Sequence, residues 1–503
     1  YARWELCVAH AGGRAGRAAE RAAASDARVR AVRVEEGKGA AAALGAALGA
    51  SEGEFVAVLA AGDALAPAAL LEVALLLGED RAADVVYTDE EVWPPGAPAP
   101  EPVLKPGWSP EYLLSRMYTG RLCVYRRAVV TGAGGFRPGF GGAREYDLAL
   151  RVAERTGRVR HVPRVLYRGR GASGGAGAPG EADAAALRAL GEHVARLGLD
   201  AACEPGASAG LYRVRHRVAG EPLVSVVIPT AGYKRAVRGE QLDLLANCVR
   251  SIVAQTDYAN YEIVCVDNGD LRDETAAALE AHGGRVRRFT FEQEGPFNLA
   301  AKMNFGAAQA AGEHLLFLND DVEVVSAGWM TALLEHSQRP GVGVVGAKLY
   351  FPDGSIQHAG VRLDEGCAPG HVYYCYPRES QRRAPDLDAV RNYSAVTGAC
   401  MMTRAALFRD LGGFDLRFPI NYNDVDYCLK ALARGLRVVY TPYAELYHFE
   451  SVSRAAEQTE GVKSEELEAF QKVWGATPEA RDAFHNPLAD AFSFAHAPGA
   501  GGR

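Results

Sequence analysis

Two adjacent carboxylates, Asp320 and Asp321, are the residues of this chain with the clearest capacity for chemistry. They follow the largely apolar run 314–318, which has the length of a strand buried on both faces of a parallel sheet. Ligands of such sheets bind beyond the carboxyl ends of the strands. Carboxylates there suit Mg²⁺ or Mn²⁺, which leave most of their coordination to water and substrate phosphate. The alternative is a solvated turn in which an aspartate caps the next helix.

Further polar residues follow strand-like or loop segments in the same half of the chain. Asp267 and Asn268 come after the apolar run 263–266, where a carboxylate can accept hydrogen bonds from a nucleoside. A tight turn is the competing interpretation, because Asn-Gly is a strong turn signal. Lys302 lies near the start of an expected helix, where it can meet phosphate charge. A solvated lysine on an amphipathic helix is its alternative.

A third group of candidates lies near the end of this half. Asp424 is the better candidate for a general base, since an ionised carboxylate can take a proton from an incoming hydroxyl. Asp426 competes with it, but an acid in a first helical turn is stabilised without any catalytic task. His448 follows another apolar segment; a lone histidine is often structural, although imidazole is also a common metal ligand.

The composition is that of a globular protein and narrows the classes of function. The chain has 503 residues, 48% of them hydrophobic, and a formal net charge of -7. A net negative charge disfavours a nucleic-acid binder. The nine cysteines form no CxxC pair, which favours reduced thiols in a cytoplasmic protein. No apolar run has the length of a transmembrane helix.

The two halves of the chain contain an internal repeat. Three groups of segments recur in the same order at offsets of 257, 259 and 278 to 280 residues, which predicts two copies of one α/β unit. The matched pairs are 1–8 with 258–265, 53–59 with 312–318, and 134–136, 145–148 and 167–168 with 412–414, 424–427 and 447–448. The apolar run 223–230 opens the second copy. Its counterpart would precede Tyr1, so the first copy is expected to lack its first strand.

This organisation predicts four segments. Residues 1–170 form a degenerate domain, and 171–220 form a linker with a helix and an extended connector. Residues 221–455 form the catalytic domain. Residues 456–503 form a C-terminal helical extension and tail.

The ordered motifs of the second copy together resemble glycosyltransferase family 2. They are 224–230, 266–269, 318–321, 397–400, 423–426 and 445–448. The subgroup most similar in outline is that of tandem-domain bacterial enzymes of O-antigen and polysaccharide assembly, which are rhamnosyltransferase-like. The resemblance implies two tandem GT-A-like domains, α/β in class, with mostly parallel central sheets.

The resemblance also implies roles for individual residues. Asp424 would be the catalytic base of an inverting transfer from a nucleotide-diphospho-sugar. Asp321 and His448 would bind Mg²⁺ or Mn²⁺. The donor would be bound by Pro229, Thr230, Asp267, Asn268, Lys302, Asn319 and Asp320. Asn319 stands where the family often has aspartate, so only Asp320 and Asp321 supply charge to this motif.

The first copy serves as an internal control for these roles. The positions matching Asn319, Asp320 and Asp321 hold Ala60, Ala61 and Gly62, with Asp63 one position late. His10 and Ala11 stand near the Asp267 and Asn268 positions, Arg168 stands at that of His448, and Glu145 keeps an acid at that of Asp424. The first copy is therefore expected to be non-catalytic, serving as a scaffold or as an acceptor-binding surface.

The expected acceptor is a saccharide or a lipid-linked oligosaccharide of surface polysaccharide biosynthesis. The expected location is the cytoplasm, with peripheral contact at the inner face of the plasma membrane. Two alternatives compete with this interpretation. One is a sugar nucleotidyltransferase, because residues 231–235 weakly resemble the phosphate-binding loop of that class. The other is a non-catalytic carbohydrate-binding scaffold.

Overall fold

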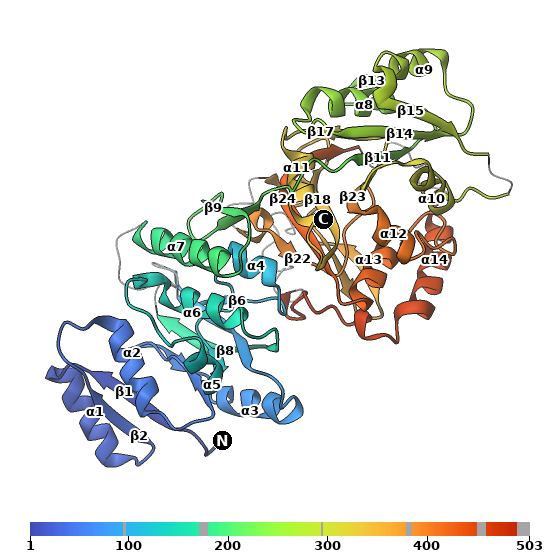
Figure 1. The fold of residues 1–503 in the computed structure, drawn as a ribbon. Coiled ribbons are helices and arrows are strands. Elements are labelled where there is room, and N and C mark those ends of the chain that lie inside the picture. Colours follow the sequence, from blue (N-terminus) through green and yellow to red (C-terminus); the bar gives the residue numbers. More distant parts are fainter. Residues whose placement is uncertain (94–96, 171–179, 293–294, 379–384, 450–458, 490–503) are drawn as a thin grey trace. The chain divides into compact units, whose positions relative to one another are not determined.

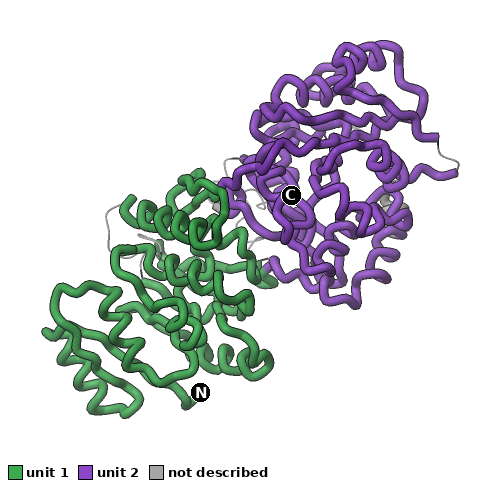
Figure 2. The backbone as a smooth tube through the Cα atoms, in the orientation of Figure 1, with its two compact units in different colours: residues 1–214, 486–503 green, residues 215–485 purple. Residues whose placement is uncertain are grey.

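The computed structural model describes residues 1–93, 97–170, 180–292, 295–378, 385–449 and 459–489. These form two compact units (Figure 2). Unit 1 contains residues 1–214 and the C-terminal segment from 486, and unit 2 contains residues 215–485. The expected tail at 499–503 lies outside the described residues. Among the residues that are described, no helix has both the length and the apolar character needed to cross a membrane.

Unit 2 is built on a ten-stranded sheet with the order β15-β14-β11-β16-β23-β18-β24-β17, to which β19 and β22 add at β18 and β24 (Figure 1). The strands are β11 (Val224–Pro229), β14 (Tyr261–Asp267), β15 (Val286–Thr290), β16 (His314–Leu318), β17 (Val322–Val324), β18 (Val342–Tyr350), β19 (Ile356–His358), β22 (Arg391–Asn392), β23 (Cys400–Arg404) and β24 (Arg437–His448). Two hairpins lie outside this sheet: β12 (Lys234–Val237) with β13 (Glu240–Asp243), and β20 (Val361–Asp364) with β21 (Ala368–His371).

Helices pack on both faces of this sheet because its central strands are apolar on both sides. α8 (Leu244–Gln255) and α11 (Trp329–Ser337) share one core with it. α10 (Leu299–Gln309), α12 (Ala405–Asp410), α13 (Asn423–Ala433) and α14 (Thr459–Trp474) share the other. α9 (Asp273–Glu280) lies beside α8. Side-chain caps fix two of these helices: Asp243 accepts from the Ala246 amide at the start of α8, and Asn298 from the Ala301 amide at the start of α10.

Unit 1 contains a six-stranded sheet and a separate two-stranded parallel sheet, β1-β2. Its strands are β1 (Leu6–His10), β2 (Val29–Arg33), β3 (Phe55–Ala57), β4 (Ala64–Leu65), β5 (Val85–Trp93), β6 (Glu101–Val103), β7 (Cys123–Arg126) and β8 (Val159–Arg170). Its helices are α1 (Gly13–Ser25), α2 (Gly39–Ala50), α3 (Ala69–Glu79), α4 (Pro110–Ser115), α5 (Arg127–Gly132), α6 (Arg144–Ala153) and α7 (Glu181–Arg196). After α7, β9 (Ala201–Pro205) pairs with β10 (Tyr212–His216).

The two large sheets repeat one topology. The order β3-β7-β5-β8-β4 of unit 1 matches β16-β23-β18-β24-β17 of unit 2. Each step has the same direction in both, with one parallel pair, β5-β8 or β18-β24, between antiparallel ones. This shared order supports the predicted tandem repeat. In the described part of unit 1, no strand joins β1 to β3 as β11 joins β14 to β16.

The predicted α/β class is confirmed, but the expectation of mostly parallel sheets needs correction. In unit 2 only β15, β14, β11 and β16 form a continuous parallel block, and the remainder of the sheet is mixed. In unit 1 the large sheet is mainly antiparallel. The reason is that long apolar runs fix burial of a strand on both faces but do not fix its direction.

A residue from the end of the chain completes the interior of unit 1. Asn486 is buried and donates through Nδ2 to the Asp89 carboxylate at 2.8 Å and to the Lys105 carbonyl at 2.9 Å. Asp89 also contacts Nε2 of His161 at 2.9 Å. The last described segment is thus part of the first unit of the fold.

Candidate active site

The predicted site residues of unit 2 gather at one edge of its sheet. β14, β11 and β16 are parallel neighbours, so Asp267, Thr230 and Asn319 follow or end strands at the same edge. β24 has the same direction as β16, because two antiparallel steps and one parallel step separate them. His448, the last residue of β24, therefore reaches this edge as well. Parallel sheets bind ligands at such an edge.

Asp321 and His448 are in direct contact, as the sequence predicted for a shared site. Oδ1 of Asp321 lies 3.2 Å from Nε2 of His448, and both side chains are buried. Nδ2 of Asn319 lies 3.1 Å from the same imidazole nitrogen. The pairing of β17 with β24 produces this contact, since Val322 is opposite His448.

Asp320 contacts the end of β11 from the same loop. Its Oδ2 accepts a 2.5 Å hydrogen bond from the hydroxyl of Thr230, the residue that follows Pro229 at the end of β11. Burial and, after it, the negative charge of Asp321 raise the pKa of the Asp320 carboxyl above its ordinary value. Two carboxyl groups so placed create a local demand for positive charge.

The residues present fit a divalent ion in part. A carboxylate and an imidazole in contact are accepted ligands of Mn²⁺, and a paired second carboxylate adds charge. Within the described residues, however, no group of three or more His, Cys, Asp or Glu side chains is gathered into a metal-binding cluster. The donor set therefore suits an ion that takes few protein ligands and completes its coordination with water and a diphosphate.

Lys302 of α10 reaches the same end of β11. Its buried ammonium donates to the Thr230 carbonyl at 2.5 Å and to Oδ1 of Asn268 at 2.7 Å. Burial lowers the pKa of Lys302 to about 8, against the opposing effect of the Asp320 and Asp267 charges. Thr230, Asn268, Lys302 and Asp320 are thus brought together, as expected for residues sharing a ligand.

Asp267 occupies a different environment from the one expected for a nucleoside contact. Its carboxylate is fully buried and accepts from Nε of Arg288, from the Gly269 amide at 2.6 Å and from the Thr290 hydroxyl at 3.2 Å. Burial alone would raise the pKa of Asp267, but these hydrogen bonds, chiefly that of Arg288, lower it. The Arg288 side chain is 38% exposed, so it is the accessible member of this pair.

Asp424, the predicted base, is held at the amino end of α13. Its Oδ2 accepts from the Gly398 amide at 2.7 Å and its Oδ1 from the Val425 amide at 2.8 Å. The next residue after Gly398 is Ala399, whose carbonyl accepts from the Asn319 amide at 3.1 Å. One dipeptide therefore connects Asp424 to the loop that carries Asp320 and Asp321.

α14 supports the turn before Asp424. Glu466, a buried residue of α14, accepts from the backbone amides of Ile420 at 3.1 Å and Asn421 at 2.6 Å. The next residue, Tyr422, has a left-handed backbone with φ of 64°, which is costly for a residue with a side chain. This turn is therefore fixed by contacts from a distant helix, as strained turns near functional sites are.

Unit 1 retains an acid at the position equivalent to Asp321 and pairs it with an arginine. Ala64 is opposite Arg168 as Val322 is opposite His448, so Asp63 matches Asp321 in the sheet. The alignment that placed Gly62 there was wrong, because the unit 1 loop is one residue longer. Asp63 accepts from Arg121 at 2.9 Å and from the Tyr167 hydroxyl at 2.6 Å.

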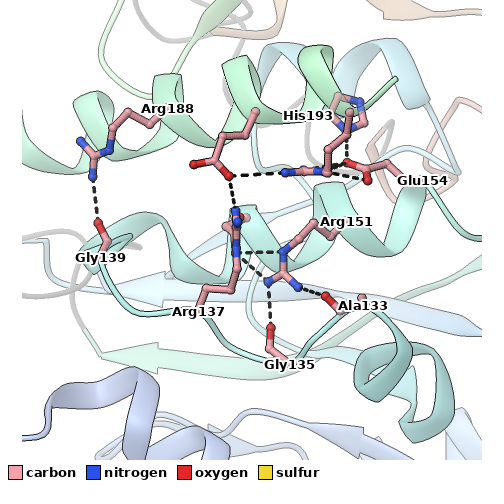
Figure 3. A network of polar contacts seen from close by, with 11 residues as sticks. Ala133, Gly135, Arg137, Gly139, Arg151, Glu154, Arg188 and His193 are labelled. Carbon is pink, nitrogen blue, oxygen red and sulfur yellow. Dashed lines mark hydrogen bonds and ion pairs between the residues drawn. The ribbon is translucent and has the colours of Figure 1, made fainter. Parts of the chain in front are cut away.

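Asp147 and Asp426 are equivalent residues of the two units, and each lies in the first turn of a helix. Asp147 of α6 is bound by Arg137 and by Arg151 four residues on, and Arg151 also reaches the carbonyls of Ala133 and Gly135 (Figure 3). Asp426 likewise pairs with Lys430, 2.7 Å away and four residues on, and accepts from Trp474 at 3.0 Å. This shared arrangement favours a structural role for Asp426.

Three residues that these contacts single out, Arg288, Glu466 and Arg121, were not candidates in the sequence. Arg288 has a weak signal, since it is one of three arginines in and beside the edge strand β15. Arg121 follows Thr119-Gly120 as Ala399 follows Thr397-Gly398, so comparing the two copies could have identified it. Glu466 has no sequence signal, because its partners are backbone amides.

Comparison with known proteins agrees with this geometry. Residues 225–412 match the model of Glycosyl transferase family 2, so this segment of the chain is similar to that family. Over 467 residues the chain is 38% identical to O-antigen biosynthesis protein RfbC of Myxococcus xanthus, covering 91% of this chain and 36% of that protein. It is 37% identical over 504 residues to the uncharacterized protein y4gI of Sinorhizobium fredii (strain NBRC 101917 / NGR234), covering 97% of this chain and 54% of that protein.

The chain thus spans about half of one relative and about a third of the other. A shorter match, 28% identical over 147 residues, joins 28% of this chain to 48% of an N-acetylglucosaminyl-diphospho-decaprenol L-rhamnosyltransferase of Mycobacterium tuberculosis (strain CDC 1551 / Oshkosh). Among solved structures, GalNAc-T7 with UDP, GalNAc and Mn²⁺ is similar at 18% identity with a TM-score of 0.41, over 50% of this chain and 48% of that one.

Proposed function

We propose that unit 2 is an inverting glycosyltransferase that moves a sugar from a nucleotide-diphospho-sugar to a saccharide or lipid-linked acceptor in surface polysaccharide biosynthesis. The relatives named for O-antigen biosynthesis and for rhamnosyl transfer support this substrate class. Unit 1 serves as a non-catalytic domain, because Arg121 fills the place beside Asp63. The proposed location is the cytoplasm, with the acceptor met at the inner face of the plasma membrane.

The observation that carries the proposal is the connection between Asp424 and the Asp321 loop through Gly398 and Ala399. It holds a base and a cluster of anionic and imidazole ligands in one rigid assembly. A single displacement needs a base on one face of the sugar and stabilisation of the leaving diphosphate on the other. The two groups held by this dipeptide match these two needs.

The residues have the following proposed roles. Asp424 takes the proton from the acceptor hydroxyl as that oxygen attacks the anomeric carbon, and the bond from that carbon to the diphosphate oxygen breaks with inversion. Lys302, Thr230 and Asn268 bind the donor's phosphate and ribose region. Asp321 and His448 would hold Mg²⁺ or Mn²⁺, which supplies Lewis-acid stabilisation of the diphosphate. Arg288, positioned by Asp267, faces the nucleoside.

The test is transfer from a panel of radiolabelled nucleotide sugars by the full chain, with membrane extract of a polysaccharide-producing bacterium as the source of acceptor. We expect Asp424→Asn to lower the rate by about 10²–10⁴-fold. The matched control is Glu145→Gln, the equivalent acid of unit 1, which should leave the rate within about twofold. Equal rates for Asp424→Asn and the parental chain would refute the role of the base.

The products separate this function from its rivals. A glycosyltransferase releases a nucleoside diphosphate, whereas a nucleotidyltransferase releases pyrophosphate from a nucleoside triphosphate. A scaffold protein would be favoured by a different pair of results. The panel would give neither glycosylated product nor nucleoside diphosphate, and calorimetry would show no nucleotide binding.

A further inference from the structure

An asparagine of α10 binds both backbone polar groups of one residue in the Gly-Gly-Phe turn before α13. Oδ1 of Asn304 accepts from the Phe414 amide at 2.9 Å, and its Nδ2 donates to the Phe414 carbonyl at 2.8 Å. Gly413, the residue before Phe414, has φ of 68°. A Cβ at Gly413 would lie 2.6 Å from Oδ1 of Asn304, so this close approach requires glycine there.

Further contacts join α10 to the loop that leads from this turn to α13. The Leu299 and Ala300 amides donate to the Pro419 carbonyl at 2.7 Å and 3.2 Å. Nδ2 of Asn298 donates to the Leu416 carbonyl at 3.0 Å. The first amides of a helix have no acceptor within it, so Pro419 supplies one that α10 requires. The helix and the loop therefore form one hydrogen-bonded assembly.

The buried ring of Phe414 contacts two elements that lead to proposed site residues. It meets Phe317 of β16 with centroids 4.7 Å apart and Tyr427 of α13 with centroids 5.7 Å apart. β16 leads into the loop of Asp321, and Asp424 lies in the first turn of α13. Asn304 therefore binds the residue at which α10, β16 and α13 meet.

α10 also carries Lys302, which the proposed function assigns to the donor. Its ammonium binds the Thr230 carbonyl and Oδ1 of Asn268. Lys302 and Asn304 lie on nearly opposite sides of α10, since each residue turns the helix by about 100°. One helix thus connects the donor residues with the loop that leads to Asp424.

Unit 1 keeps the Gly-Gly-Phe turn but not the asparagine. α2 precedes β3 as α10 precedes β16, at the offset of 259 residues, so Asn304 corresponds to Gly45 and Lys302 to Ala43. The turn is retained at 134–136, where the two glycines have φ of 86° and 64°. The asparagine is therefore lost together with the site lysine while the turn persists. This pattern favours a role in the site over a role in the fold.

We infer that Asn304 is a positioning residue of the proposed transferase, which fixes the base Asp424 relative to the donor held at Lys302. Asn304 acts through the turn at Phe414 and the start of α13. Reacting groups must be held in near-attack geometry, so a small displacement of the base lowers the rate strongly. This inference rests on the proposed function, because it concerns the base of that reaction.

The test compares Asn304→Ala with the parental full chain, using the responding nucleotide sugar of the panel and the membrane extract as acceptor. The rate at saturating donor should fall by about tenfold, because the loop before the base is released from α10. The donor KM and the stoichiometry of binding of the matching nucleoside diphosphate should not change, because Lys302 keeps its own contacts. Gln309→Ala, at the last residue of the same helix, is the matched control.

A double variant separates positioning of the base from general destabilisation. If Asn304 acts through Asp424, Asn304→Ala should lower the rate by less than about twofold in an Asp424→Asn chain, whereas a purely structural role would give the full loss in both chains. Hydrogen exchange of the segment 413–425 should become faster in Asn304→Ala and stay unchanged in Gln309→Ala.

Three results would overturn the inference alone. They are equal losses in the presence and absence of Asp424, a changed donor KM with an unchanged rate, and unchanged exchange of the segment 413–425. A parental chain that transfers no sugar from any donor would instead refute the proposed function, and with it the role of Asn304.

Discussion

The guanidinium of Arg121 donates a 2.9 Å hydrogen bond to the carboxylate of Asp63, at the sheet position where Asp321 meets His448 in the other copy of the fold. The side chains of both acids are buried, and a buried carboxylate requires a partner of opposite charge or strong hydrogen bonds. Unit 1 supplies this charge from its own chain. Unit 2 instead has an imidazole and a second carboxyl beside Asp321, and in the proposed function Mg²⁺ or Mn²⁺ would supply the positive charge.

The first prediction compares these two acids. Asp321→Asn should abolish any stimulation of donor binding by Mn²⁺, since it removes one of the two proposed protein ligands. Isothermal titration of UDP, GDP and dTDP with and without Mn²⁺ measures this change. Asp63→Asn is the control and should leave nucleotide binding unchanged. Unaltered Mn²⁺ dependence in Asp321→Asn would exclude this aspartate as a ligand.

The second prediction concerns the pH dependence of donor use. Burial lowers the pKa of Lys302 to about 8, so its ammonium is present below that pH and is lost as the pH rises through it. kcat/KM for the donor should therefore decline above about pH 8, as it follows the free enzyme. In Lys302→Arg this alkaline decline should disappear, because a guanidinium stays charged. Lys234→Met, at an exposed lysine paired with Glu274, should keep it.

The third prediction tests Glu466 as a positioning residue. Glu466→Ala removes the acceptor of the Ile420 and Asn421 amides, so the turn before Asp424 should loosen and kcat should fall by about tenfold or more with the donor KM unchanged. Glu466→Gln keeps one acceptor oxygen and should recover part of kcat. Glu468→Ala, at an exposed residue of the same helix, is the control. Equal loss in the Gln and Ala variants would contradict a role for the hydrogen bonds.

The fourth prediction concerns the acid stability of unit 1. Burial would raise the pKa of Asp147, but Arg137 and Arg151 together hold it below the ordinary 3.8. The stabilisation is therefore complete above the unfolded pKa and is lost as the pH falls through the lower folded value. Asp147→Asn should cost about 3 kcal/mol near neutral pH, because it leaves buried charge unpaired, and much less in acid.

Guanidinium denaturation at neutral and acid pH measures this difference, with hydrogen exchange in α6 assigning the transition to unit 1. Asp26→Asn is the control. Asp26 pairs with Arg28 on the surface, where ion pairs contribute little to stability. A loss of stability in Asp147→Asn that is independent of pH would contradict the ionic explanation.

The sequence was sufficient for the class of fold and for which residues meet at the sheet edge. Apolar runs ending in Asp, Asn or His mark strand ends, and strands with a common direction bring those ends together. This reasoning placed Asp321 and His448 at one sheet edge, and the family resemblance grouped Thr230, Asn268 and Lys302; the contacts bring the members of each set together. Burial patterns could not predict that the sheets mix parallel and antiparallel strands, because strand direction depends on how the chain connects the strands.

The sequence was insufficient wherever a role depends on a partner far along the chain. The Asp267 position suggested an accessible carboxylate, yet Arg288 from the neighbouring strand covers it. The one-residue insertion before β4 hid the equivalence of Asp63 with Asp321, because only strand pairing reveals it. Backbone acceptors such as Glu466 leave no pattern, since any sequence offers amide groups.

The position of Asn486 in unit 1 affects the order in which the interiors of the two units are completed during synthesis. Asp89 and Lys105 emerge from the ribosome early, whereas their amide partner follows nearly four hundred residues later. All of unit 2 must be synthesised before the buried polar group around Asp89 is satisfied. During translation, the polar group around Asp89 therefore lacks its Asn486 partner while the proposed catalytic unit is being made, and the segment that carries Asn486 is the one that completes it.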